Sequence, residues 1–225
     1  VNRLENDFRH KVVLVTGASN GIGAEIVRRC SALGAKVVLN YNSDTEAAQA
    51  IQKDCEKKGG IVFLKQGDVS DEEFIKEMFQ SVSKEVGKVE YLVNNAGINR
   101  DGFLMTSSIR DIDTVVDTNL MGTIYCCKYA LSHMISNRKG VIVNISSVSG
   151  FKGTSGQTIY GSTKAGIIGL TKALAIEMAK YNIRVNSISP GFINTRMVEG
   201  ITPKLQEEYL NAIPLKRFGE CSEVA

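Results

Sequence analysis

Histidine is scarce in this chain, which contains only His10 and His133, and neither lies near the motifs described below. This scarcity argues against a Ser-His-Asp hydrolase and a histidine-rich metal site, because both need imidazole groups placed together. The five cysteines are an odd number, and no two of them form a Cys-x-x-Cys pair. That pattern favours a reducing compartment over a disulfide framework or a zinc site. We therefore expect no bound metal.

Strong charge and long apolar runs are also missing. The net charge of +3 is too small to indicate a nucleic-acid surface. No apolar stretch reaches the length of a membrane span, and the start of the chain shows no signal-peptide pattern. We expect a cytoplasmic protein with no nucleic-acid or membrane partner, and an organelle stays open if a leader was removed before Val1.

Runs rich in β-branched residues alternate with helical patterns along the 225 residues, a length that suits one α/β domain. Strands are expected at 11–16, 36–41, 61–66, 89–94, 140–146 and 183–189. Helices are expected at 21–33, 44–58, 71–86, 107–117, 119–137, 158–181 and 203–212. Strands separated by helices imply right-handed crossovers. With no linker and no internal repeat, the sequence predicts a doubly wound parallel sheet in a single three-layer α/β/α domain of Rossmann type over 1–225.

A glycine-rich turn follows the first expected strand, with the sequence Thr16-Gly17-Ala18-Ser19-Asn20-Gly21-Ile22-Gly23. Glycines let the backbone approach a pyrophosphate closely, and the N-terminus of the following helix offers unpaired N–H groups to the anion. An ordinary turn between strand and helix also favours glycine. The flanking strand and helix favour nucleotide binding.

Tyr160 follows Ser147 by 13 residues, and Lys164 lies one helical turn after Tyr160. Residues at i and i+4 share a helix face, so the ammonium can stay near the phenol. A phenol with a pKa of about 10 is a poor acid-base catalyst at neutral pH, and a fixed positive charge favours the phenolate. A serine hydroxyl could hold a substrate oxygen while the tyrosine transfers its proton. Tyr-x-x-x-Lys also occurs by chance on many helices.

Four further motifs have competing explanations. In Asn94-Asn95-Ala96-Gly97, the amides can tie loops together beside a cofactor, or the segment is a plain turn. In Asp68-Val69, the Asp68 carboxylate can accept a hydrogen bond from an adenine amino group, or Asp68 can cap the next helix. Asn119 inside a helical pattern suggests a kink or a water site. The segment 190–195, which begins Pro190-Gly191, can close over the cofactor or simply mark a turn.

Together, the glycine-rich turn, the Asn-Asn-Ala-Gly segment, Asn119, Ser147, Tyr160-x-x-x-Lys164 and Pro190-Gly191 resemble the classical short-chain dehydrogenase/reductase family, in family order over nearly the whole chain. The resemblance implies that Tyr160 is the general acid/base, that Ser147 binds the substrate carbonyl and that Asn119 holds a water of the proton relay. Lys164 would lower the tyrosine pKa and bind the nicotinamide ribose. The implied cofactor-binding residues are Gly17, Ser19, Asn20, Gly21, Ile22, Gly23, Tyr41, Asp68, Val69, Asn95, Ala96, Gly97, Tyr160, Lys164, Pro190, Gly191, Ile193 and Thr195.

The segments 94–101, 156–160 and 213–219 are similar to those of the 3-oxoacyl-acyl-carrier-protein reductase branch. This resemblance implies NADPH-dependent reduction of a 3-oxoacyl thioester in fatty-acid synthesis, with Arg138 and Lys139 as candidate contacts of the carrier protein. A solvated basic turn after a helix is the alternative for this pair. The alternative functions are a family member acting on another alcohol, ketone or sugar, and a catalytically silent cofactor-binding subunit.

The sequence departs from this branch at several points. Asn20 stands where the branch often has an arginine for the 2′-phosphate of NADP. The expected strand 36–41 nevertheless ends without the acidic residue that takes an NAD ribose, so NADP(H) is favoured. The family normally continues beyond Ala225 to a final strand, which this sequence apparently lacks. We expect a homo-oligomer, a dimer through the helices 119–137 and 158–181 or a tetramer.

Overall fold

The protein is described by a computed structural model that places residues 8–196, 198 and 202–225. Within these residues, six parallel strands form one sheet in the order β3-β2-β1-β4-β5-β6. The strands are β1 (Val12–Val15), β2 (Lys36–Tyr41), β3 (Ile61–Gln66), β4 (Tyr91–Asn94), β5 (Gly140–Ile145) and β6 (Ile183–Ile188). This order is that of a doubly wound Rossmann-type sheet, so the predicted fold class is confirmed.

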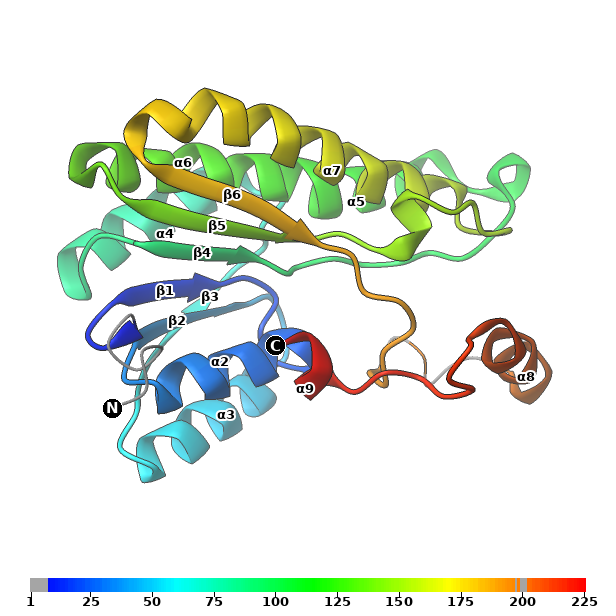
Figure 1. Ribbon diagram of the computed structural model, residues 1–225, viewed down its shortest axis with the longest axis horizontal. Coiled ribbons are helices and arrows are strands. Elements are labelled where there is room, and N and C mark those ends of the chain that lie inside the picture. Colours follow the sequence, from blue (N-terminus) through cyan, green and yellow to red (C-terminus); the bar gives the residue numbers. More distant parts are fainter. Residues whose placement is uncertain (1–7, 197, 199–201) are drawn as a thin grey trace.

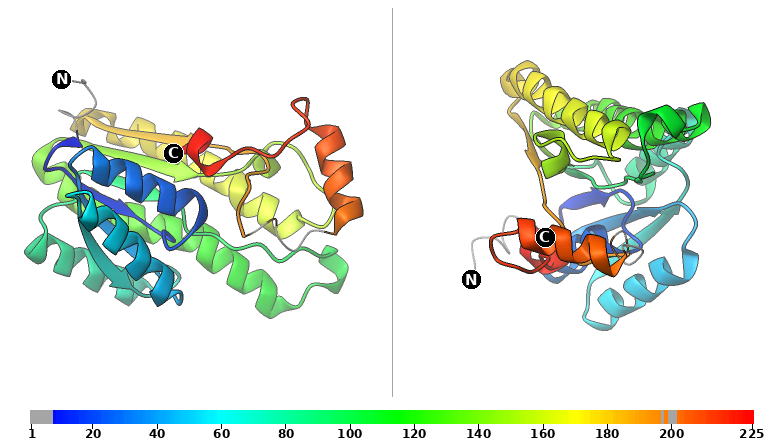
Figure 2. Two further views of the ribbon diagram at one scale, coloured as in Figure 1. Left: turned by 90° about the horizontal axis from the view of Figure 1, so that it is seen from below. Right: turned by 90° about the vertical axis from the view of Figure 1, so that its right-hand side faces the viewer.

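Helices cover both faces of the sheet, as Figure 1 shows. On one face lie α2 (Gly21–Ala32) and α3 (Thr45–Lys57), and on the other lie α4 (Glu72–Glu85), α6 (Gly122–Asn137) and α7 (Thr158–Met178). Three shorter α-helices also occur in the described ranges, namely α5 (Ile109–Val116), α8 (Pro203–Ala212) and α9 (Cys221–Val224). Figure 2 shows that α8 stands apart from the sheet, at the end where the strands finish. None of the helices in the described ranges has the length and apolar character needed to cross a membrane.

The two faces of the sheet are packed by alternate residues of the same strand. In β1, Val12 and Leu14 belong to the core under α4, α6 and α7, whereas Val13 and Val15 belong to the core under α2 and α3. Side chains of a strand point alternately to opposite faces. A strand buried on both faces therefore reads as a continuous apolar run, which is why the sequence signal for β1 was clear.

The start of α4 decides between the two roles considered for Asp68. Asp71 caps this helix by accepting hydrogen bonds from the backbone N–H groups of Glu73 and Phe74, at 3.0 and 3.2 Å. Asp68 instead accepts from the backbone and hydroxyl of Ser70, at 2.9 and 2.8 Å. The helix-cap interpretation of Asp68 is therefore wrong.

The apolar residues of α6 and α7 are mostly used by the core of this chain. Met134 on α6 and Ile167, Leu174 and Met178 on α7 are buried within it. Ile176 on α7 is 82% exposed. These apolar residues are therefore largely explained by the chain's own core, and the dimer through the two helices stays a prediction.

Candidate active site

A cavity of about 1150 Å³ lies at the carboxyl ends of the strands, at the point between β1 and β4 where the strand order reverses. Ligands of doubly wound proteins bind at this point of the sheet. The cavity lining includes most of the site residues predicted from the sequence, namely Gly17, Ser19, Asn20, Gly21, Ile22, Asp68, Val69, Asn95, Ala96, Gly97, Ser147, Tyr160, Lys164, Pro190, Gly191, Ile193 and Thr195.

Tyr41 does not line the cavity, which corrects its assignment as a cofactor contact. Its side chain is only 5% exposed and packs in the core under α2 and α3. Its hydroxyl lies 3.5 Å from Oε1 of Gln66. Because neighbouring side chains of a strand point in opposite directions, Asn40 and Asn42 line the cavity instead.

Two glycines of the turn after β1 have backbone conformations that other residues rarely adopt. Gly17 has a φ of +58°, and a Cβ there would lie 2.6 Å from Cα of Ala96. Gly21 has a φ of +56°, and its Cβ would lie 3.3 Å from Cγ2 of Thr195. The third glycine, Gly23, packs against the side chain of Asn95 rather than lining the cavity. These close approaches explain why the turn is rich in glycine.

The loops after β1 and β4 are joined by side-chain hydrogen bonds. The hydroxyl of Thr16 accepts from the backbone N–H groups of Asn95 and Ala96, at 3.0 and 3.1 Å. The Asn95 amide donates to the carbonyls of Thr16 and Gly17, at 3.0 and 2.9 Å. The prediction that asparagine amides tie neighbouring loops together is therefore confirmed. These hydrogen bonds fix the two loops that line the cavity where β1 and β4 end.

Asn119 is fully buried in a π-helical segment (Asp117–Met121) that joins α5 to α6. Its Oδ1 accepts from the backbone N–H of Ile98 at 2.8 Å, and its Nδ2 donates to the Ile98 carbonyl at 2.9 Å and to the Thr163 hydroxyl at 3.2 Å. The expected local irregularity in the helix is confirmed. The side chain holds the loop after β4 against α7 behind the cavity lining, and a water-holding role stays a prediction.

Ser147, Tyr160 and Lys164 come together at one side of the cavity. Ser147 lies two residues after the end of β5, and its hydroxyl accepts from the backbone N–H of Ser149 at 3.1 Å. Tyr160 and Lys164 lie in the first two turns of α7. The Lys164 ammonium lies 5.6 Å from the centre of the Tyr160 ring and donates to the carbonyl of Ile145 at 2.9 Å. The predicted shared helix face is confirmed.

Burial dominates the electrostatics of these side chains. It raises the pKa of Tyr160, against a smaller lowering by the hydrogen bond with Ser147, and the Asp101 charge raises that pKa further. Burial also lowers the pKa of Lys164 to about 8. The expected lowering of the phenol pKa by Lys164 is not seen. Burial alone therefore makes Tyr160 a weaker acid than a free phenol, although it stays protonated at neutral pH.

Sequence reasoning missed Asp44 and Arg196, which face each other across the cavity lining. Arg196 Nη1 lies 2.6 Å from Oδ2 of Asp44, although the two residues are 152 positions apart. Asp44 also caps α3 by accepting from the backbone N–H of Ala47 at 3.1 Å. The capping role could be found from local sequence, but no local signal relates it to Arg196.

The strand order and the glycine-rich turn define a Rossmann-type nucleotide-binding protein. Comparison with known proteins narrows this class, because the model of the family described as short chain dehydrogenase matches residues 11–206. The chain belongs to this short-chain dehydrogenase family.

Three curated relatives illustrate the similarity. The chain is 42% identical over 215 residues to the 3-oxoacyl-[acyl-carrier-protein] reductase FabG of Staphylococcus aureus, with 96% of this chain and 87% of the relative covered. It is 42% identical over 217 residues to the FabG of Chlamydia muridarum, with the same coverage. It is also 42% identical over 215 residues to carbonyl reductase family member 4 of Xenopus tropicalis, covering 96% of this chain and 88% of the relative.

Proposed function

We propose that this chain is an NADPH-dependent 3-oxoacyl-acyl-carrier-protein reductase, an oxidoreductase that forms the 3-hydroxyacyl thioester in fatty-acid synthesis. The observation that carries the proposal is the meeting of Ser147, Tyr160 and Lys164 in the same cavity as the glycine-rich turn. The names of the relatives from Staphylococcus aureus and Chlamydia muridarum support the choice of substrate.

The proposed chemistry is a carbonyl reduction in which this chain supplies the proton. When bound, NADPH supplies the hydride that goes to the keto carbon. Ser147 donates a hydrogen bond to the keto oxygen and orients it. Tyr160 then gives its phenolic proton to that oxygen, which completes the alcohol. Burial alone raises the pKa of Tyr160 and opposes this transfer, so the step depends on the nearby positive charge of Lys164.

Lys164 and Asn119 assist this proton transfer without themselves giving the proton. Lys164 is fixed by the Ile145 carbonyl and keeps a positive charge beside the tyrosine, where it stabilises a developing phenolate and contacts the nicotinamide ribose. Asn119 acts as a positioning residue, since its amide holds the loop at Ile98 against α7. The glycine-rich turn and the segments at Asn95 and Pro190 hold the dinucleotide.

The site fits the dinucleotide on one physical ground. Gly17 and Gly21 both have positive φ values, a Cβ at Gly17 would collide with the backbone of Ala96, and α2 starts at Gly21. Backbone exposed in this way at a helix N-terminus suits a pyrophosphate.

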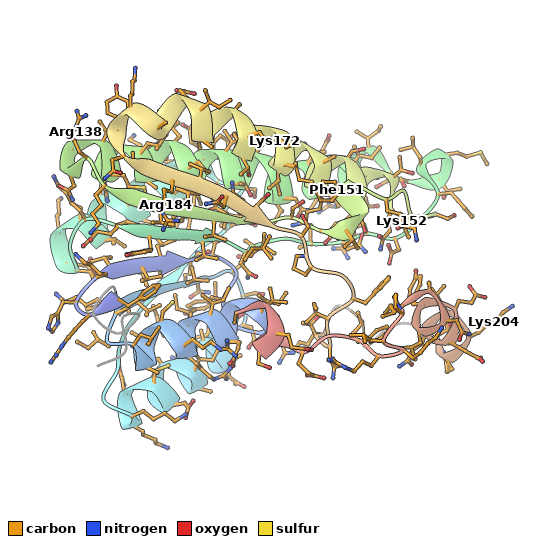
Figure 3. All side chains as sticks on the ribbon, viewed as in Figure 1. Arg138, Phe151, Lys152, Lys172, Arg184 and Lys204 are labelled. Atoms are coloured by element: carbon orange, nitrogen blue, oxygen red, sulfur yellow. The ribbon has the colours of Figure 1, made fainter. Side chains whose placement is uncertain are left out.

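Arg138 and Lys139 are the proposed carrier contacts, but their position limits how they act. Both precede β5, whereas Ser147 follows it, so the length of the strand, about 20 Å, separates them from the reacting carbonyl. Figure 3 shows Arg138 at the opposite end of the sheet from Lys152, a cavity residue. Arg138 also ends α6 in a left-handed conformation and donates to the Lys180 carbonyl at 2.9 Å. A carrier bound there must deliver its thioester through an extended arm or to a neighbouring subunit.

The test is NADPH consumption with an acetoacetyl thioester, compared with a panel of sugars and alcohols. Tyr160→Phe keeps the ring but removes the transferable proton, so turnover should fall by about 100-fold or more while nucleotide binding persists. Tyr129→Phe is the matched control, because Tyr129 lies on α6, is not among the residues that line the cavity, and donates its hydroxyl to Glu72 at 3.0 Å. Activity kept within a few-fold in Tyr160→Phe would contradict the assignment. Preference for a sugar or alcohol would favour another family activity, and no turnover on any substrate would favour a silent subunit.

A further inference from the structure

The ion pair between Arg196 and Asp44 joins two segments that are 152 positions apart in the sequence. Arg196 belongs to the chain that leaves the carboxyl end of β6 and runs down past the side where α2 and α3 lie (Figure 1). Asp44 caps α3, just after β2. The side chains of Arg196 and Asp44 are 61% and 32% exposed. Exposed pairs of this kind contribute about 0–1 kcal/mol, so Arg196 is not held there by a strong interaction.

The place of this pair corresponds to the ribose end of a bound dinucleotide. In Rossmann-type proteins the residue at the end of the second strand contacts the adenosine ribose, and a nearby arginine accommodates a 2′-phosphate. Here β2 is followed by Asn42, Ser43 and Asp44, which all line the cavity. Thr195 lies against Gly21 of the glycine-rich turn, so Arg196 follows directly from a residue beside that turn.

The other cations of the cavity lie elsewhere. Among the described residues that line it, the positively charged ones are Arg100, Lys152, Lys164 and Arg196. Lys164 is buried against the Ile145 carbonyl, and Lys152 follows the turn after Ser147. Arg100 lies 3.9 Å from Asp111 at the start of α5. Asn20, at the N-terminus of α2, carries no charge. Arg196 is therefore the cation of this set that stands at the ribose end.

We propose that Arg196 recognises the 2′-phosphate of NADPH and determines the preference for NADPH over NADH, in place of an arginine at Asn20. The proposal rests on the proposed reductase function only for the identity of the nucleotide. A guanidinium can bind a phosphate through two parallel hydrogen bonds, and a doubly charged phosphate competes well with one exposed carboxylate. Asp44 keeps the guanidinium near the ribose end and is displaced when the phosphate binds.

The proposal predicts opposite effects for the two partners. Arg196→Gln removes the charge and should weaken NADP⁺ binding by about tenfold or more while the Kd for NAD⁺ is unchanged. Arg196→Lys should recover part of the loss. Asp44→Asn keeps a capping side chain for α3 but removes the competing carboxylate, so it should tighten NADP⁺ binding several-fold.

Titration calorimetry with NADP⁺, NAD⁺ and adenosine 2′,5′-bisphosphate measures these effects without turnover. Arg184→Gln is the matched control, because it removes the same charge from β6 outside the cavity (Figure 3). Equal weakening of NADP⁺ and NAD⁺ in Arg196→Gln, or no change in either, would overturn the proposal, as would weaker NADP⁺ binding in Asp44→Asn. If selective loss of NADP⁺ is found but no 3-oxoacyl thioester is reduced, only the proposed function fails. If the thioester is reduced and the two Kd values change together, only the role of Arg196 fails.

Discussion

Replacing Lys164 with methionine should make the folded protein more stable and the enzyme inactive. Lys164 is 3% exposed, and its ammonium donates to the carbonyl of Ile145. No ion pair of Lys164 occurs within the described part of the chain. Burial without a carboxylate partner lowers the pKa of this side chain from 10.5 to about 8. A buried cation of this kind costs free energy at neutral pH.

The size of the cost follows from the pKa. Each tenfold change in proton affinity corresponds to about 1.4 kcal/mol, so burying the charged form costs roughly 3 kcal/mol at pH 7. Methionine fills a similar volume but leaves the Ile145 carbonyl without this donor, which takes back about 1 kcal/mol or more. The expected net gain in the free energy of unfolding is roughly 1–2 kcal/mol.

The gain should shrink as the pH rises. Between pH 8 and 10.5 the unfolded chain keeps the lysine proton and the folded chain releases it, so the stability of the wild type rises with pH through this side chain. The advantage of Lys164→Met should therefore fall by about 1 kcal/mol between pH 7 and pH 9. Burial raises the pKa of Cys30 to about 11, but that thiol titrates in both proteins and cancels in the difference.

Urea unfolding at pH 7 and pH 9 measures both quantities, provided that the slope with denaturant is unchanged. Lys172→Met, on the exposed side of α7 (Figure 3), is the control and should show neither effect. A less stable Lys164→Met at pH 7, or an advantage that does not change with pH, would refute the reasoning.

Two further predictions concern pH and assembly. Burial lowers the pKa of His133, assisted by the charge of Lys88, and its Nδ1 accepts from the Val89 N–H at 3.1 Å. Since the unfolded chain takes up this proton first as the pH falls below about 6.5, stability should drop there. In urea titrations His133→Asn, whose amide oxygen can still accept, should lose that dependence. A Cβ at Gly169 on α7 meets nothing within 4 Å, so Gly169→Arg should fold normally yet convert a dimer to a 24.5 kDa monomer in light scattering. A wild type that is already monomeric would reject the interface.

The central strands β1 and β2 could be predicted because burial on both faces leaves a plain sequence signal. Residues 12–15 and 37–39 are apolar without interruption, and all of them are buried in the structure. The fourth strand begins at Tyr91 rather than at Val89, whose N–H donates to His133. Between α5 and α6 the sequence indicated two helices, and the structure joins them through a π-helical segment, a change of hydrogen bonding that apolar spacing does not reveal.

The candidate site could be predicted only where its residues lie in compact motifs. The glycine-rich turn and the pair Tyr160 and Lys164 each bring their chemistry within a few positions, so spacing alone was informative. Tyr41 was assigned wrongly because the sequence does not say which face of β2 looks into the cavity. Arg196 gave no signal because its partner Asp44 is 152 positions away. Their meeting depends on the path of the chain after β6, which no local pattern fixes.

Several residues in or beside the cavity have an unusual backbone conformation or an unfavourable burial. Gly17 and Gly21 have positive φ values, and Lys164 is a cation without a carboxylate partner in the described chain. A sequence commonly departs from local preferences where function demands it. Stabilising changes at such positions commonly cost activity. A gain in stability for Lys164→Met together with loss of turnover would show that the burial of this lysine is kept for its chemistry, because packing alone would favour the methionine.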